Sequence, residues 1–267
     1  MTSHTNPNIK YQRFRKLSYF IDLLRSLVDR DMKLTYKRSV LGIVWTLISP
    51  LLQLLVFIFV FRSIIKIDIP QYASFVFTGL LIWTWFQSSL FQATGAIVYS
   101  AALIRQPGFP TVILPVVMVT NGLIHLMLAL PILIIFLLID GAKFTPLVFL
   151  LPLLLLIQFA LTVTFSYFLA AINVKFRDTQ HTLGVVLQLL FYLSPIFYQL
   201  SNVPEKYWDI YKLNPMVHII TAYRKILILG VPPNWHALGI IAIVILIFLP
   251  IGYQLFRRQS FQFIEEI

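Results

Sequence analysis

Six long apolar runs constrain this chain more than any other feature of its sequence. They cover residues 42–61, 72–97, 111–139, 146–172, 183–200 and 236–256. A helix of roughly 20 mainly apolar residues crosses the hydrocarbon core of a bilayer, with its backbone groups paired internally. Only 12% of the residues are charged, whereas a soluble domain is about 25% charged. We therefore expect an all-α membrane protein with six transmembrane helices, in which residues 1–41 precede a membrane domain of residues 42–267.

The lysines and arginines that flank the runs are distributed unequally between the two sides of the membrane. An even number of crossings places both termini on one side, and short loops rich in these residues face the cytoplasm. The side of the termini carries Lys10, Arg13, Arg15, Lys16, Arg25, Arg30, Lys33, Lys37, Arg38, Arg105, Lys175, Arg177, Arg257 and Arg258. The other side carries Arg62, Lys66, Lys143, Lys206, Lys212, Arg224 and Lys225. Fourteen against seven predicts cytoplasmic termini.

Two shorter segments lie outside the runs. Before the first run, apolar residues recur at helical spacing and predict an amphipathic helix in the membrane interface. These residues are Phe20, Leu23, Leu24, Leu27 and Val28. Between the fifth and sixth runs, residues 216–229 are too few and too polar to cross, and they predict short re-entrant or surface-lying helices on the outer side. The polar first forty residues predict no cleaved signal peptide.

The composition argues against several classes of function. The chain has no cysteine and therefore no disulfide or thiolate metal site. Its net charge of +11 suits anionic lipid headgroups better than nucleic acid, because the basic residues are not gathered on a soluble domain. Asp68 and Asp140 stand in short loops without a histidine or carboxylate neighbour, so both are expected to be solvated. We expect no catalytic residue, no metal site and no bound cofactor in this chain.

Ionisable residues are nearly absent from the interior of the runs. A charged side chain inside the bilayer costs several kcal/mol and usually has a functional role. His125 is the exception, and with Asn121 and Ala129 it forms a stripe better suited to close helix packing than to a proton relay. No glycine is followed by lysine, so the chain has no P-loop for a nucleotide. If ATP drives a transport reaction here, a separate chain must hydrolyse it.

Weakly polar and aromatic side chains form stripes at helical spacing on three of the runs. Trp45, Ser49, Gln53 and Phe57 lie on the first, Thr84, Ser88, Phe91, Gln92 and Gly95 on the second, and Gly184, Gln188, Phe191, Tyr192, Pro195 and Gln199 on the fifth. One such stripe alone is best explained by helix–helix contact. Three together suggest a conduit for a neutral, hydroxyl-rich polymer, with aromatic faces for sugar CH groups and amides for hydroxyls.

The residues that we expect to line this conduit come from these stripes and their neighbours. They are Trp45, Gln53, Thr84, Trp85, Ser88, Phe91, Gln92, Gln188, Phe191, Tyr192 and Tyr198. An alternative remains for Trp83, Trp85, Phe86 and Tyr99, because aromatic side chains also gather at headgroup depth.

Several motifs in order resemble the permease subunit of type-2 ABC exporters, and more closely the branch that exports O-antigen, capsule and teichoic-acid chains. The motifs are "RDMKLTYKRSVLGIVWTLISPLLQ" (Arg30–Gln53), "FTGLLIWTWFQSSL" (Phe77–Leu90), "LIRQPGFPTVILP" (Leu103–Pro115), "KFRD" (Lys175–Asp178), "FYLSPIFY" (Phe191–Tyr198) and "LNPM" (Leu213–Met216). The chain departs from the family after Phe109-Pro110, where relatives often carry a basic residue and this chain has Thr111 and Val112.

This resemblance implies partners and a location. It implies a homodimer in the bacterial cytoplasmic membrane, with two copies of a separate ABC ATPase that holds ATP and magnesium. The substrate would be a lipid-linked polysaccharide such as a glycan on undecaprenyl diphosphate. The competing hypotheses are a type-2 exporter of a small lipophilic molecule, a membrane-embedded glycan-processing enzyme and a secondary carrier. The enzyme would need clustered carboxylates or histidines, and the carrier would need intramembrane charges.

The resemblance also assigns roles to cytoplasmic residues. Arg30, Asp31, Lys33 and Tyr36 would lie near the ATPase. Lys37 and Arg38 would contact a pyrophosphate, although anchoring to anionic lipid explains them equally well.

The polar segment "NVKFRDTQH" (Asn173–His181) interrupts two apolar runs and is predicted to be a cytoplasmic hairpin that couples to the ATPase. A local ion pair between Arg177 and Asp178 would contribute only about 0–1 kcal/mol if exposed. Our hypothesis is that Phe176 packs while Arg177 and Asp178 orient the hinge. A merely solvated connector is the alternative.

Overall fold

The computed structural model describes residues 7–37, 44–66, 68–142, 144–260 and 263, with side chains from residue 18 onward. Every regular element in these ranges is helical, which confirms the all-α prediction. The elements are α1 (Pro7–Tyr36), α2 (Trp45–Phe57) continued by a π-helix (Ile58–Ile64), α3 (Tyr72–Tyr99), α4 (Ala101–Ile104), α5 (Ile113–Ile139), a 3-10 turn (Pro146–Leu150) leading into α6 (Leu151–Lys175), α7 (Asp178–Tyr192), 3-10 turns (Leu200–Asn202 and Glu205–Tyr207), α8 (Trp208–Leu213), α9 (Pro215–Arg224) continued by a π-helix (Lys225–Leu229), and α10 (Trp235–Gln259).

Five helical stretches in the described residues are long and apolar enough to cross a membrane, so the predicted count of six is not confirmed. They are Trp45–Ile64, Tyr72–Tyr99, Ile113–Ile139, Pro146–Lys175 and Trp235–Gln259. The fifth predicted run, residues 183–200, differs from expectation because α7 has only 15 residues and ends at Tyr192. The chain continues through a bent segment that contains Pro195, which has no N–H for a helical hydrogen bond.

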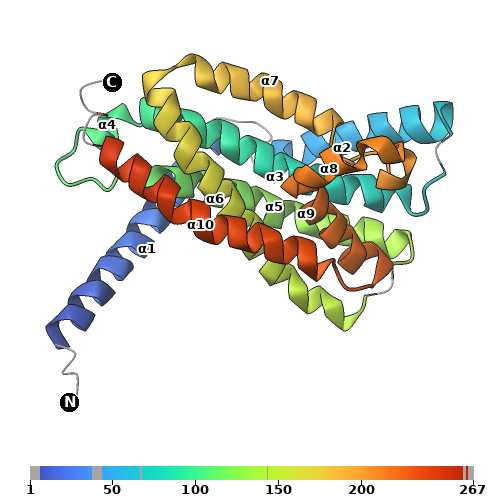
Figure 1. Cartoon of the computed structure of the whole chain (residues 1–267), viewed down its shortest axis with the longest axis horizontal. Coiled ribbons are helices and arrows are strands. Elements are labelled where there is room, and N and C mark those ends of the chain that lie inside the picture. Colours follow the sequence, from blue (N-terminus) through green and yellow to red (C-terminus); the bar gives the residue numbers. More distant parts are fainter. Residues whose placement is uncertain (1–6, 38–43, 67, 143, 261–262, 264–267) are drawn as a thin grey trace.

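The helix α3 is the centre of the molecule. It packs against α2, α5, α6, α7 and α9, and Figure 1 shows it running along the middle of the bundle. In its spanning window 78% of the residues are buried, against 11% for the stretch Trp45–Ile64. The helix α10 packs on α6, whereas α1 touches α5 and projects away from the bundle. The helix α3 is therefore positioned to form a wall of any space between the surrounding helices.

The connections between helices gather at the two ends of the long axis. In Figure 1, α4, the α6–α7 turn and the end of α10 lie at one end, while the connections leading into α3 and α6 lie at the other with α8 and α9. This arrangement separates most of the two groups of basic residues used to predict sidedness. Arg224 is an exception, because it is buried in the bundle and only 6% exposed.

Side chains from neighbouring segments begin three of the helices. Asn214 accepts a hydrogen bond from the backbone N–H of Met216 at 3.0 Å and caps α9, and Asn234 caps α10 in the same way. At the start of α3, the Oδ2 atom of Asp140 accepts from the N–H of Ser74 at 3.0 Å. The expectation that Asp140 is merely a solvated loop charge is therefore wrong.

The apolar stripe of α1 is the face that packs on the bundle. Leu27 and Val28 are buried and belong to the main hydrophobic core. On the opposite face Asp22, Arg25 and Lys33 are exposed. Helical periodicity in this segment thus correctly indicates which side chains of α1 pack and which face away.

Candidate functional site

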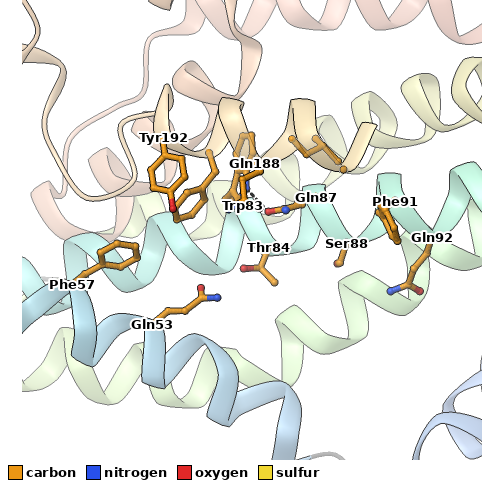
Figure 2. Close-up of a pocket in the computed structure, with 13 residues that line it drawn as sticks. Gln53, Phe57, Trp83, Thr84, Gln87, Ser88, Phe91, Gln92, Gln188 and Tyr192 are labelled. Carbon is orange, nitrogen blue, oxygen red and sulfur yellow. Dashed lines mark hydrogen bonds between the residues drawn. The ribbon is translucent and has the colours of Figure 1, made fainter. Parts of the chain in front are cut away.

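A cavity of about 520 Å³ lies between α2, α3 and α7 (Figure 2). Its walls are contributed by one face of each helix. The lining residues are Gln53, Phe57, Trp83, Thr84, Gln87, Ser88, Phe91, Gln92, Gly184, Leu187, Gln188, Phe191 and Tyr192. An adjoining open cavity shares Gln87, Phe91, Gly184 and Gln188 with it and reaches His181 in the first turn of α7. The space therefore extends along α7 toward the α6–α7 turn.

The chemistry of the cavity wall is polar and aromatic without charge. Four glutamines, a threonine and a serine supply amide and hydroxyl groups, and five aromatic rings supply apolar faces. None of the thirteen described lining residues is an acid, a lysine, an arginine or a histidine. The indole N–H of Trp83 donates to Oε1 of Gln87 at 2.7 Å, which fixes the orientation of both side chains. Such a wall can hydrogen-bond hydroxyl groups and stack on apolar ring faces.

Eight of the eleven residues expected to line a conduit lie around this one cavity. They are Gln53, Thr84, Ser88, Phe91, Gln92, Gln188, Phe191 and Tyr192. Five lining residues were not among those chosen: Phe57 and Gly184, which belong to the predicted stripes, Trp83, Gln87 and Leu187. Whether these side chains contact a transported molecule remains a prediction.

The other three expected conduit residues lie elsewhere. Trp85 is buried on the side of α3 that faces α5, where its indole N–H donates to the carbonyl oxygen of Val119 at 3.1 Å. Trp45 is 53% exposed and does not line the cavity. Tyr198 bonds to Tyr211 and to the carbonyl of Tyr192 just beyond the cavity. Helical spacing alone could not separate Trp85 from its lining neighbour Thr84, and it could not show that the cavity lining ends at Gln53 and at Tyr192.

The α6–α7 turn contacts the cavity wall through a residue that sequence reasoning missed. The side-chain amide of Gln180 donates to the carbonyl oxygen of Phe91 at 3.2 Å, and its Oε1 accepts from Tyr99 at 3.2 Å. Gly95 makes this approach possible, because a Cβ atom there would lie 2.7 Å from Nε2 of Gln180. Gln180 thus connects the start of α7 to α3.

The three coupling residues of this turn are all exposed. Arg177 precedes α7, and Asp178 is in its first turn, where a carboxylate favours the positive end of the helix dipole. Phe176 is 68% exposed, so the hypothesis that it packs within the chain is wrong. It lies in a sharp turn between two helices, where no other described element covers the ring.

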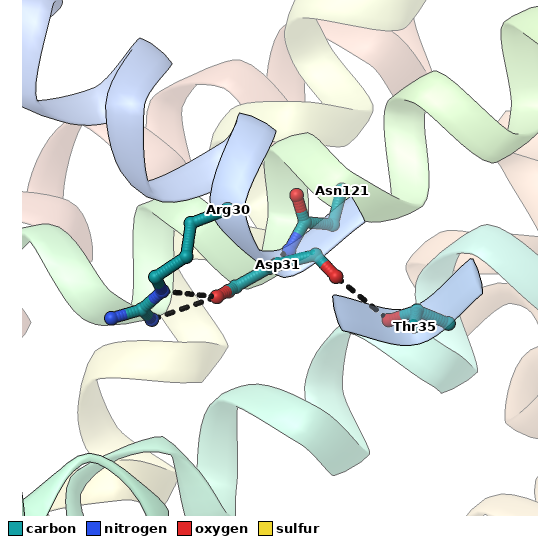
Figure 3. Close-up of polar contacts among 4 residues, drawn as sticks. All are labelled: Arg30, Asp31, Thr35 and Asn121. Carbon is teal, nitrogen blue, oxygen red and sulfur yellow. Dashed lines mark hydrogen bonds and ion pairs between the residues drawn. The ribbon is translucent and has the colours of Figure 1, made fainter. Parts of the chain in front are cut away.

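A polar cluster joins α1 to α5 (Figure 3). Asp31 accepts from Arg30 at 2.7 Å and from the amide of Asn121 at 3.4 Å, and its backbone carbonyl accepts from Thr35. One turn further, the hydroxyl of Tyr36 lies 3.2 Å from Nδ1 of His125. Burial raises the pKa of Tyr36, which keeps the hydroxyl protonated for this contact. The stripe of Asn121 and His125 is therefore in contact with α1, in agreement with the packing interpretation.

The remaining basic candidates lie near this cluster. Lys33 is exposed and pairs with Asp29 at 2.6 Å. Lys37 is exposed at the end of α1. Lys33 and Lys37 line an open surface pocket with Arg30 and Tyr36. Arg38, the second candidate for contacting a pyrophosphate, lies outside the described residues.

The observed position of Arg224 differs more from the prediction than that of any other polar residue named above. It was assigned to the outer side with the loop charges, yet its guanidinium is buried and bonds to the carbonyl oxygens of Phe75, Pro195 and Ile196. It also stacks on the ring of Phe75, with 3.4 Å between its Cζ atom and the ring centroid. An arginine within a largely apolar segment was the available signal, because such a residue is rarely left without buried partners.

No cluster of three or more histidine and acidic side chains that could hold a metal ion occurs within the part of the chain that the structure describes.

Comparison with known proteins gives consistent matches over most of the chain. Residues 22–228 match the family described as ABC-2 type transporter. The O-antigen export system permease protein RfbA of Myxococcus xanthus is 34% identical over 255 residues, which cover 95% of this chain and 98% of the relative. A protein of the same name from Klebsiella pneumoniae is 30% identical, covering 93% and 96%. The polysialic acid transport protein KpsM of Escherichia coli is 23% identical, covering 89% and 93%.

Proposed function

Because the chain belongs to the ABC-2 type transporter family, we propose that it is the permease subunit of an exporter that moves a lipid-linked polysaccharide across the bacterial cytoplasmic membrane. It is a multi-pass membrane protein and not an enzyme. ATP and magnesium are held by a separate ATPase subunit, in keeping with the absence of a P-loop from the sequence.

The observation that carries this proposal is the uncharged, aromatic and amide-rich wall of the cavity between α2, α3 and α7. Sugar rings present CH faces that pack on aromatic rings, and their hydroxyls bond to amides. A wall without fixed charge lets a long neutral polymer slide, because no single site holds it strongly. The names of the relatives, which refer to O-antigen and polysialic acid, support a polysaccharide substrate. We propose a glycan carried on undecaprenyl diphosphate.

The arrangement in the membrane is part of the proposal. The helix α7 and the bent segment after it form a sixth crossing, which places both termini in the cytoplasm of a bacterial cell. The bent segment is buried and has hydrogen-bond partners, as irregular backbone at membrane depth requires. The short helices α8 and α9 then lie at the outer side as a re-entrant pair, and α1 lies in the cytoplasmic interface.

The complex consists of two copies of this chain and two ATPase subunits. The exposed ring of Phe176, with Arg177 and Asp178, supplies one docking surface for the ATPase. The cluster of Arg30, Asp31, Lys33 and Tyr36 on α1 supplies the second. Lys37 and Arg38 either contact the pyrophosphate of the lipid carrier or anchor α1 to anionic headgroups.

Depletion of the chain from cells tests the proposed function. Export predicts that lipid-linked glycan accumulates on the cytoplasmic side and that surface glycan falls. In purified form, the chain should stimulate hydrolysis of ATP by its partner ATPase. Unchanged amounts of lipid-linked and surface glycan in depleted cells, together with an ATP hydrolysis rate that the permease does not change, would exclude this function. Altered export of a small lipophilic compound with normal glycan would favour the alternative exporter.

A further inference from the structure

The segment that follows α7 combines irregular backbone with deep burial. Ser194 and Ile196 are fully buried, and Phe197 is 9% exposed, although no helix includes them. The helix α7 ends at Tyr192, so carbonyl groups beyond this point need partners other than the helical N–H groups. A buried carbonyl without a partner costs free energy comparable to a lost hydrogen bond. The partners of this segment therefore determine where it can lie.

Three side chains from distant parts of the chain supply these partners. The guanidinium of Arg224 donates to the carbonyls of Pro195 and Ile196, the latter at 2.6 Å. The hydroxyl of Tyr72 donates to the carbonyl of Phe197 at 3.2 Å. The amide of Asn214 donates to the hydroxyl of Ser194 at 3.0 Å. Arg224 is the central one, because its Nε–H also donates to the carbonyl of Phe75 at 3.0 Å and so joins α3, α9 and the bent segment.

The position of the segment places an aromatic ring against one end of the cavity. The ring of Phe197 stacks on Phe57 with centroids 5.2 Å apart and on Phe61 at 4.7 Å. It also contacts the ring of Phe191 at 6.1 Å. Phe57 and Phe191 line the cavity near the C-terminal ends of α2 and α7. We call the four rings of Phe57, Phe61, Phe191 and Phe197 the aromatic plug.

We propose that Arg224 is a positioning residue, which we call the latch, that holds the aromatic plug across the end of the cavity and so keeps the conduit closed when no substrate is passing. This inference rests on the proposed function and its orientation, in which the plug lies at the outer end. A planar guanidinium suits the role because it donates in several fixed directions and stays charged at any physiological pH. A lysine could hold only part of this arrangement, since its ammonium is a single point charge on a flexible stem.

A labelling experiment tests the latch without measuring glycan export or ATP hydrolysis. The chain has no cysteine, so Gln188→Cys gives a single reactive thiol in the cavity wall. A membrane-impermeant maleimide is added on the outer side of intact cells, and the rate of labelling is measured in the full-length protein. Arg224→Met keeps a long side chain but removes every donor, and Phe197→Ala removes the ring of the plug while the latch stays in place.

We expect both variants to increase the labelling rate about tenfold, because losing one or two hydrogen bonds or a stacked ring shifts the closed–open equilibrium by that order. Arg224→Lys should give an intermediate rate. Arg62→Met, which removes an exposed arginine from the π-helix that continues α2, is the control and should not change the rate. If Arg224→Met does not accumulate in membranes, Phe197→Ala and Arg224→Lys decide the question.

Rates equal to that of the unaltered background in Phe197→Ala and in every Arg224 variant that folds would overturn the latch and leave the proposed function untouched. Normal glycan export in depleted cells would overturn the proposed function, while the labelling rates would still report whether the cavity is closed. Faster labelling together with an unchanged melting temperature supports a positioning role, because a purely structural role would lower both stability and protection.

Discussion

Gln53 and Gln188 lie on opposite walls of the cavity, on α2 and α7, and both expose their amides to the same space. Within the residues that the structure describes, neither side-chain amide makes a hydrogen bond, whereas Oε1 of Gln87 accepts one from Trp83. Their amides are thus free to bond to hydroxyl groups of a passing molecule. At the scale of single residues, the proposed substrate chemistry depends most on these two positions.

Replacing both amides with apolar groups should slow export. The double variant Gln53→Leu/Gln188→Leu removes two hydrogen-bonding groups at about 0.5–1.5 kcal/mol each, which corresponds to about tenfold slower appearance of surface glycan. Immunoblots of surface glycan at matched permease levels measure the effect. Gln106→Leu, at an exposed position outside the cavity, is the matched control. Equal export by the double variant and the control would contradict the role of the amides.

The cap of α3 gives a prediction about stability. Asp140→Ala removes the acceptor for the N–H of Ser74 and should destabilise the protein by about 1 kcal/mol. Asp140→Asn retains an acceptor oxygen and should recover most of this loss. Asp68→Ala, in the preceding loop and exposed, is the control. Melting temperatures in detergent measure the difference, and equal values for all three variants would show that the cap contributes nothing.

At this scale the sequence predicts which helix faces are polar or apolar, but not which distant groups meet. Eight cavity residues were found because they share stripes at helical spacing. Asp140 and Arg224 were misassigned because their partners, Ser74 and Phe75, lie 66 and 149 residues away in the sequence. Such pairs depend on how helices are arranged in three dimensions, which hydrophobic periodicity does not specify.

The helices themselves were predicted well where a single apolar run coincides with a single helix. The expected runs at 72–97 and 111–139 correspond closely to α3 and α5. The run at 183–200 does not, because hydropathy continues through residues whose backbone leaves the helix near Pro195. Hydrophobicity measures burial, and both a helix and a buried bent segment satisfy it. Only the hydrogen-bond donors that the backbone carbonyls find in the folded protein distinguish a helix from a buried bent segment.

The start of α7 is the element through which we expect ATPase motion to reach the cavity. Gln180→Leu removes the bonds to Phe91 and Tyr99 while keeping a side chain of similar size. We expect export and permease-stimulated ATP hydrolysis to become uncoupled, with export falling several-fold more than hydrolysis. Thr182→Ala, an exposed position on the same helix, is the control. A proportional fall of both activities, or no fall, would count against this route.

The docking surface at the turn gives a separate expectation. Because Phe176, Arg177 and Asp178 are exposed, alanine at Arg177 and Asp178 together should weaken ATPase binding and lower both export and stimulated hydrolysis in parallel. Co-purification of the ATPase with the permease measures the binding. Unchanged co-purification and unchanged export would mean that the turn is only a solvated connector.

At the scale of the whole molecule, the chain leaves large apolar faces uncovered. In the stretch Trp45–Ile64 only 11% of the spanning window is buried, and Leu55 and Phe59 are each more than half exposed. Lipid or a second copy of the chain can cover such a face. In the proposed dimer, the second copy covers it and completes the conduit. We expect a protein mass in detergent of about twice 30.9 kDa when the micelle is subtracted. A mass of one chain, measured by light scattering, would exclude a stable dimer.

The central position of α3 has a consequence for how the protein is made. Of the five spanning stretches, α3 has the lowest mean hydropathy, 1.2, and the greatest burial. Its polar side chains are matched to neighbouring helices rather than to lipid, so on its own it should partition poorly from the translocon into the bilayer. A nascent chain that ends after α3 should integrate less efficiently, in a glycosylation-mapping assay, than one that also contains α5. The helix that organises the finished bundle is therefore expected to depend on a later helix for its own integration.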